Sequence, residues 1–292
     1  IMKRYERLIT NNLKRLLFVV GLSILSVYLY TFDFSLLSGI VLSGIVNKVI
    51  VITGFILLYF FVRALRWHVL LKSIGISIPF RKLYVMNSVA LGIGVYTPAS
   101  LGEGVKLQLL KDSDGVKRRT TLQLFMLEKF FDFLVVILFA LFGGFVLNYI
   151  SLKIFGVVIA FSILSFILFK SILMNRLQVL KDINYSSLGT AFILTVISWF
   201  IVVYNWVLLS DIINLNSGFI QMMLVNSLSA LIIFISLVPG GLGFMEVSNS
   251  YLISNILSVE LALGTLFALF ARLYTVYALI IGVTHLLFKS SK

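Results

Sequence analysis

Apolar segments about as long as a bilayer is thick follow one another along almost the whole of this chain. Of its 292 residues, 60% are hydrophobic and 12% are charged, whereas charged residues make up about 25% of a soluble domain. A helix of ~20 apolar residues spans a bilayer with its backbone hydrogen bonds satisfied internally. The sequence therefore predicts an all-α fold, a polytopic helical membrane protein.

Basic residues are concentrated in short stretches between some of these apolar segments. The net charge is +13, but its distribution follows the positive-inside rule for cytoplasmic loops, so we expect no nucleic-acid partner. The basic stretches lie at residues 3–15, 63–82, 111–119, 170–181 and 289–292. Other connectors carry Asp33, Asp211 and Glu260 and are assigned to the outside. Both termini are then cytoplasmic, in the inner membrane of a prokaryote.

Most of the apolar segments are long enough to cross once. These predicted spans are residues 16–32, 49–71, 123–149, 154–173, 188–209 and 261–288. Residues 83–96 and 101–110 are shorter and have basic stretches at both outer ends, so we expect a re-entrant pair of half-helices. Residues 219–237 and 244–257 form a second interrupted segment, which is entered from outside.

One short motif interrupts both of these unusual segments. Pro-x-x-Leu-Gly, with a glutamate close behind, begins at Pro98 and again at Pro239. Paired Gly/Pro interruptions in two halves indicate a transporter built from inverted repeats. We therefore divide the single transmembrane domain, 1–292, into repeats at about 45–150 and 186–288, joined by the helix at 154–173. The alternative is that both prolines only kink ordinary spans, which membrane helices tolerate.

The backbone at such a break has its own chemistry. A helix that starts inside the bilayer presents free N–H groups, and its dipole adds about half a positive charge, which favours an anion. The two breaks are expected to meet around a hollow of headgroup size. Glycines would let a ligand approach the main chain, or let helices pack closely. These glycines are Gly102, Gly104, Gly240, Gly241 and Gly243.

Arginines inside the apolar segments need partners. Arg272 lies about 25 Å from the basic C-terminal end at ~1.5 Å per residue, well inside the hydrocarbon. It requires a carboxylate or a phosphate, and Glu246 is the expected protein partner. Arg63 and Arg66 share one face near the cytoplasmic end of their span. They either anchor the helix at the interface or meet a phosphate headgroup first.

Acidic residues inside the first half pose a similar question. Glu128 and Asp132, four residues apart on one helix face, repel each other unless a cation, such as Lys129, or a proton intervenes. Glu103 and Ser100 fit a capping box, in which the carboxylate satisfies the N-cap amide. The alternative is that Glu103 takes part in function.

Five motifs in order carry a family resemblance. They are Arg63-x-x-Arg66-Trp67, Thr97-Pro98-x-x-x-Gly102-Glu103, Leu127-Glu128-Lys129-x-x-Asp132, Val238-Pro239-Gly240-Gly241-Leu242-Gly243-x-x-Glu246 and Ala271-Arg272. Over residues 60–285 the chain resembles the flippase-like membrane family. That family includes the membrane region of lysylphosphatidylglycerol synthases, also called multiple peptide resistance factors, and stand-alone bacterial and archaeal proteins.

The resemblance implies movement of lipids across the cytoplasmic membrane. Aminoacylated phosphatidylglycerol and polyprenyl-linked sugars are the implied cargoes, and Arg66, Glu103, Glu128, Glu246 and Arg272 are the implied functional core. The sequence contains no soluble synthase domain after the last span, so transfer of an amino acid from tRNA is not expected.

These observations together predict a lipid flippase that is not an enzyme and needs no cofactor. No Gly-rich nucleotide loop occurs, so direct use of ATP is not expected. The expected partners are membrane lipids, with a lipid-modifying enzyme as a further candidate. The alternatives are an intramembrane enzyme acting on a lipid phosphate and a non-transporting partner module of such an enzyme. The residues predicted to bind the lipid are Arg63, Arg66, Pro98, Ser100, Gly102, Glu103, Lys106, Glu128, Asp132, Pro239, Gly240, Gly241, Gly243, Glu246 and Arg272.

Overall fold

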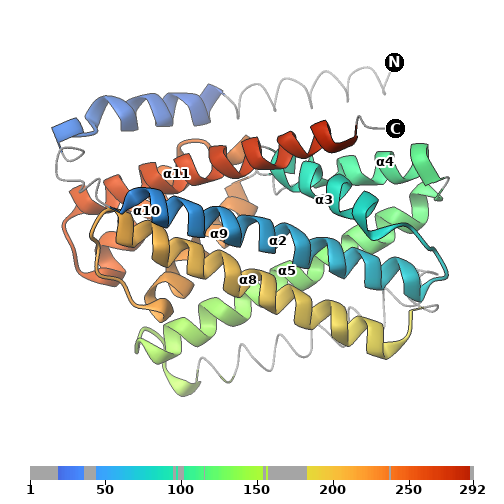
Figure 1. The fold of residues 1–292 in the computed structure, drawn as a ribbon. Coiled ribbons are helices and arrows are strands. Elements are labelled where there is room, and N and C mark those ends of the chain that lie inside the picture. Colours follow the sequence, from blue (N-terminus) through green and yellow to red (C-terminus); the bar gives the residue numbers. More distant parts are fainter. Residues whose placement is uncertain are drawn as a thin grey trace, which may run out of the picture.

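The computed structural model of the chain is a bundle of helices, most of which run roughly side by side (Figure 1). The structure describes residues 19–35, 44–94, 97, 102–114, 116–153, 156, 183–236 and 238–289. Within these residues there are helices and turns and no strand, as the sequence predicts. Five of the described helices are long and apolar enough to cross a membrane.

The helices begin and end close to the predicted boundaries. The five long ones are α2 (Ile45–Ser73), α5 (Arg118–Val146), α8 (Tyr185–Ile212), α9 (Phe219–Ser236) and α11 (Leu261–Thr284). The shorter elements are Val19–Thr31, α3 (Phe80–Gly94), α4 (Val105–Asp114), α10 (Phe244–Leu257) and the 3-10 turns η3 (Pro239–Gly241) and η4 (His285–Lys289). The last predicted helix thus tightens into a 3-10 turn at His285. The span predicted at 154–173 falls outside the described residues, except for residue 156.

One end of the bundle is rich in basic residues. Here α3 begins, α4 ends and α5 begins, and the side chains of Leu83, Leu110 and Leu124 belong to one buried apolar cluster. The basic residues of these segments are Lys72, Arg81, Lys82, Lys111, Lys117, Arg118 and Arg119. We call this the basic end. The connection between α3 and α4 lies away from it and is called the first break.

The opposite end contains the start of α9 and the end of α10. Gln221 Nε2 donates a hydrogen bond to the carbonyl of Ile256 at 3.5 Å. At the same end, Lys48 Nζ donates to the carbonyl of Asp211 at 2.5 Å, so α2 begins where α8 ends. The helices α9 and α10 therefore run into the bundle and return to one end. We call their connection, 238–243, the second break.

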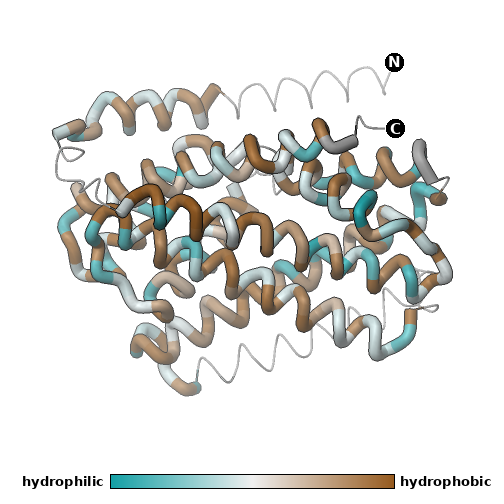
Figure 2. The backbone as a smooth tube through the Cα atoms, viewed as in Figure 1, coloured by the Kyte–Doolittle hydropathy of each residue, from teal (hydrophilic) through white to brown (hydrophobic). Residues whose placement is uncertain are grey.

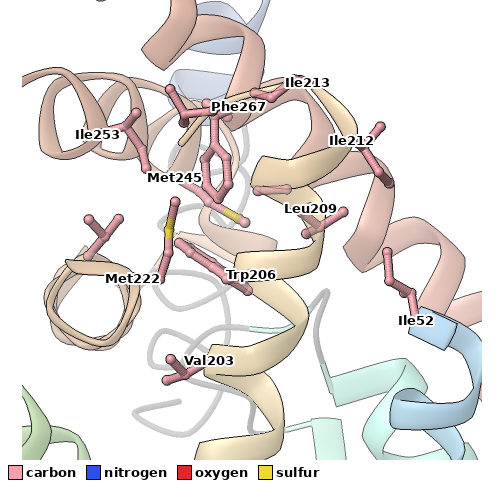
Figure 3. Close-up of a cluster of buried hydrophobic side chains, with 14 of the residues drawn as sticks. Ile52, Val203, Trp206, Leu209, Ile212, Ile213, Met222, Met245, Ile253 and Phe267 are labelled. Atoms are coloured by element: carbon pink, nitrogen blue, oxygen red, sulfur yellow. The ribbon is translucent and has the colours of Figure 1, made fainter. Parts of the chain in front are cut away.

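The apolar interior is centred on α8, α9, α10 and α11. Figure 3 shows side chains from these helices converging, among them Trp206, Met222, Met245 and Phe267. All four are 5% exposed or less. The rings of Trp206 and Phe267 lie 5.4 Å apart at 60°, a tilted pair that stabilises the contact beyond the area it buries. This packing holds the second break against the long spans.

Apolar side chains also cover the outside of the bundle. Tyr30, Ile235 and Leu287 are 91%, 80% and 75% exposed, and apolar segments run along the helices in Figure 2. A soluble protein rarely exposes contiguous apolar surface on this scale. The exterior therefore suits the hydrocarbon of a bilayer.

The N-terminal helix Val19–Thr31 packs against the second break. Gly243 has a φ of 75°, and a Cβ added there would lie 2.5 Å from the Cβ of Ile24. Further along the helix, the hydroxyl of Tyr28 donates to the carbonyl of Thr265 at 2.5 Å. Glycine is therefore required at residue 243 both for its backbone conformation and for this close approach.

Candidate functional site

Seven charged side chains meet between α2, α5 and the start of α4. Helix α2 contributes two arginines one turn apart, α5 contributes two acids and a lysine, and the chain after the first break contributes an acid and a lysine. We call this group the first charge cluster: Arg63, Arg66, Glu103, Lys106, Glu128, Lys129 and Asp132. Six of its members are 4% exposed or less, and the side chain of Lys129 is 20% exposed.

The two arginines bridge the acids of α5. Arg63 donates to Asp132 Oδ1 at 2.5 Å and to Glu103 Oε2 at 3.2 Å. Arg66 donates to Glu128 Oε1 and, at 3.0 Å, to Asp132 Oδ1. The carboxylates of Glu128 and Asp132 therefore share two guanidinium groups, which explains why they tolerate each other on one helix face.

The lysines complete the cluster from the other side. Lys106 Nζ lies 2.5 Å from Glu128 Oε2 and 4.5 Å from the centre of the Trp67 ring, an ion pair and a cation–π contact. The Nε1 of Trp67 donates to the same carboxylate oxygen at 2.7 Å. Lys129 Nζ lies 2.6 Å from Glu103 Oε1. Glu128 is thus the acceptor on which most of the cluster converges.

Burial makes this cluster sensitive to the loss of its buried members. Four cations face three carboxylates, so the cluster carries one formal positive charge in excess. Removing one partner of a buried ion pair leaves an uncompensated charge, which typically costs about 3–5 kcal/mol. Arg63 and Arg66 are 3% and 0% exposed, so the alternative that they anchor α2 at the membrane interface is wrong.

The start of α4 differs in part from its predicted form. Pro98 and Ser100 fall outside the described residues, and with them the predicted capping box. Thr97 Oγ1 accepts a hydrogen bond from the N–H of Gly102 at 2.6 Å. Both carboxylate oxygens of Glu103 contact cations of the first charge cluster. The N–H groups at this turn are therefore satisfied in part by a threonine side chain.

A second charged group lies at the second break. Arg272 donates through Nε to Glu246 Oε1 and through Nη2 to Glu246 Oε2 at 3.1 Å, the bidentate geometry that makes arginine–carboxylate pairs strong. The ion pair expected from the sequence is present. Glu246 also stands in the first turn of α10, where the helix dipole favours a carboxylate. We call Arg272 and Glu246 the second charge cluster.

The backbone of the second break completes the coordination of Arg272. Its Nη1 donates to the carbonyl of Gly240 at 2.9 Å and its Nη2 to that of Gly241 at 3.4 Å. These two glycines have φ values of 63° and 59°, which glycine adopts at little cost. Pro239 begins η3 just before them. The partners of Arg272 are thus protein oxygens, namely the carboxylate of Glu246 that the sequence predicts and two backbone carbonyls.

A cavity of about 210 Å³ separates the two breaks. Glu103 lines it from the first break and Gly240 from the second, and α2, α3, α8, α9, α10 and α11 supply the rest of its wall. Since one water occupies ~30 Å³ of liquid, the cavity holds a group of several heavy atoms. The hollow expected between the two motifs is therefore present, with a charge cluster on each side.

Several polar residues of this wall were not identified from the sequence. Among them are Trp199 on α8 and Asn226 and Ser229 on α9. A single tryptophan or serine in an apolar helix is indistinguishable from a packing residue. The available signal is the spacing of Asn226 and Ser229, three residues apart and so on one helix face.

Long apolar helices around buried charged groups and a central cavity are the structure of a multi-pass membrane protein. A family model described as the lysylphosphatidylglycerol synthase TM region matches residues 13–282, and the chain belongs to this family. The resemblance found in the five sequence motifs is thereby confirmed. Neither the curated proteins nor the solved structures gave a significant match.

Proposed function

We propose that this protein is a lipid flippase that moves a lipid with an anionic or modified headgroup between the two leaflets of the membrane. The observation that carries the proposal is the cavity of about 210 Å³ that Glu103 and Gly240 border from opposite breaks. Membership of a family named after the synthase of a headgroup-modified lipid supports a lipid-related function. Aminoacylated phosphatidylglycerol and polyprenyl-linked lipids are the candidate cargoes.

In the proposed orientation the basic end faces the cytoplasm, because lysine and arginine are enriched in cytoplasmic loops. The pair α3 and α4 is then a re-entrant hairpin open to the cytoplasm, and α9 and α10 form one open to the outside. The two halves would be inverted repeats, which in transporters bind substrate at their interface near the bilayer midplane. In this orientation the cavity, which both breaks border, would lie at that interface.

An anionic headgroup would enter the first charge cluster by exchange. Every cation of the cluster contacts a carboxylate, so a phosphate would take the place of one of these carboxylates. Glu103 is the natural one, because it lines the cavity and its contact with Arg63, at 3.2 Å, is longer than that of Asp132, at 2.5 Å.

Transport in reconstituted liposomes tests the proposal. With a fluorescent anionic lipid and a membrane-impermeant quencher, we expect wild-type protein to bring inner-leaflet lipid to the outer leaflet. Arg63→Gln and Arg272→Ala should each slow this about tenfold, the effect of ~1.4 kcal/mol on a barrier, because each removes a cation of a charge cluster that flanks the cavity. Glu260→Gln is the control, because Glu260 is exposed at the start of α11. Equal rates for wild type and both variants contradict the mechanism.

We further propose that the protein does not alter its lipid chemically. The carboxylates of both charge clusters are engaged by cations, which disfavours a free general acid or base. Thin-layer chromatography of the lipids after transport should show one unchanged species. A new lipid species would instead support the intramembrane enzyme. Normal cellular function without transport would support the partner module.

A further inference from the structure

Three polar atoms on the cavity wall have no hydrogen-bond partner among the described residues. They are Trp199 Nε1, Asn226 Oδ1 and Ser229 Oγ. Asn226 and Ser229 are 4% and 1% exposed. Folded proteins leave few buried polar groups unpaired, so a molecule inside the cavity is needed to pair with them.

The polar groups of this wall that remain available to a ligand are uncharged. Among the described wall residues, Glu103 is the charged one, and both of its carboxylate oxygens contact cations outside the cavity wall. Arg272 directs its three nitrogens to Glu246 and to backbone carbonyls. The cavity therefore offers neutral donors and acceptors, although charge clusters flank it.

Aromatic rings form much of the rest of the wall. Tyr59 and Phe60 come from α2, Trp199 and Trp206 from α8, and Tyr274 from α11. Binding sites commonly combine apolar walls with a few polar groups that orient the ligand. A ligand with C–H faces between its polar groups can pack against these rings while its polar groups reach α8 and α9.

We propose that the cavity binds the hydroxyl-bearing part of a headgroup, such as a glycerol or a sugar. A hydroxyl both donates and accepts, so one ligand can accept from Trp199 Nε1, donate to Asn226 Oδ1 and do either with Ser229 Oγ. The cavity, at about 210 Å³, is far smaller than a whole lipid. The acyl chains would remain in the bilayer. The inference rests on the proposed function in one respect, namely that the hydroxyl groups belong to a lipid headgroup.

Intrinsic fluorescence in nanodiscs provides the binding assay, because Trp199 and Trp206 are two of the three tryptophans. The two lipid probes are phosphatidylglycerol and phosphatidylmethanol, which carry the same phosphodiester charge and differ in headgroup hydroxyls. We expect phosphatidylglycerol to bind about tenfold more tightly, as expected for ~1.4 kcal/mol. Methyl glucoside, which has no acyl chains, tests whether a soluble polyol binds instead.

Two variants on α9 test the residues. Ser229→Ala and Asn226→Leu should each abolish the preference for phosphatidylglycerol. Both should leave the melting temperature without lipid unchanged or raised, because they remove buried polar atoms that have no partner. Ser227→Ala is the matched control, since Ser227 is buried on the same helix but its hydroxyl donates to the carbonyl of Met223 at 2.7 Å. It should keep the preference.

The outcomes separate this inference from the proposed function. Equal binding of both lipids would mean that the cavity does not select for headgroup hydroxyls, and a preference that survives both α9 variants would mean that it arises elsewhere; either result overturns the proposal. Saturable binding of methyl glucoside without lipid preference overturns the lipid source of the hydroxyls. Preferential binding without transport in the liposome assay supports the site and contradicts the flippase. Transport without preferential binding supports the flippase and contradicts the hydroxyl-binding site.

Discussion

The two charge clusters lie on opposite sides of one cavity and are built differently. The first joins seven side chains from α2, α5 and the first break, and its central carboxylate, Glu128, accepts from Arg66, Lys106 and Trp67. The second joins one arginine to one glutamate and adds two backbone carbonyls. Both contain a glutamate just after a break, Glu103 in one and Glu246 in the other.

The difference teaches how each cluster responds to the loss of one member. In the first cluster every charge has several partners, so a lost cation can be replaced in part by a neighbour. In the second cluster the loss of Arg272 leaves Glu246 buried beside carbonyl oxygens, with no described cation in contact. The first cluster is thus suited to exchanging partners, as the proposed transport requires, and the second to fixing the shape of its break.

The largest expected effect is that of Glu128→Ala. It removes the common acceptor and raises the excess charge of the first cluster from one to two, so we expect a loss of about 3–5 kcal/mol in stability. Glu128→Gln, which keeps an acceptor for Trp67, should lose less. Thermal unfolding in detergent, with size-exclusion chromatography for folding, measures both. A Glu128→Ala protein as stable as wild type would contradict the convergence on this residue.

A smaller loss of stability, which a second substitution should recover, is expected at the second cluster. Arg272→Leu should destabilise the protein by about 3 kcal/mol, because Glu246 is left buried without its partner. Combining it with Glu246→Leu should recover much of this loss, since an apolar pair replaces an ion pair. The same unfolding measurement, as a double-mutant cycle, gives the coupling. If the losses of stability in the two single variants add up in the double variant, Arg272 and Glu246 are not energetically coupled, which would contradict the prediction.

The smallest effect is expected for Lys129→Ala. Its side chain is 20% exposed, and its loss brings the first cluster to charge neutrality, so stability should change by less than about 1 kcal/mol. The melting temperatures of this variant and of Glu128→Ala, measured together, give the smallest and largest stability losses expected within the first charge cluster. A loss of stability as large as that of Glu128→Ala would contradict the expected difference between a partly exposed and a fully buried member of the cluster.

Features that depend on local sequence could be predicted. The spans follow from the length of apolar segments, and the breaks follow from Pro98 and Pro239, since proline and glycine interrupt helices by themselves. The burial of Arg272 follows from its place far inside the last apolar segment, and Glu246 was the acid expected to pair with it within the same half. Each of these required knowledge of one helix or of two neighbouring ones.

Features that depend on the packing of distant helices could not be predicted. The sequence indicated that Glu128 and Asp132 needed a cation, but Arg66 lies on another helix, 62 residues from Glu128. Its further partner Thr195, at 2.8 Å, is 129 residues away. No periodicity or motif encodes such pairs. The polar residues of the cavity wall could not be predicted for the same reason, because Trp199 and Asn226 lie on different helices and line one cavity only in the folded protein.

The packing of the N-terminal helix on the second half has a consequence for biosynthesis. Tyr28 and its partner Thr265 are 237 residues apart, which at ~5–20 residues per second separates their synthesis by roughly 12–47 s. During that interval the first helix is already made while its protein partners are still missing, and lipid must cover the surface it will later bury. Completion of the fold therefore waits for the last helix, and a chain stopped before α11 would lack the hydrogen bond between Tyr28 and Thr265.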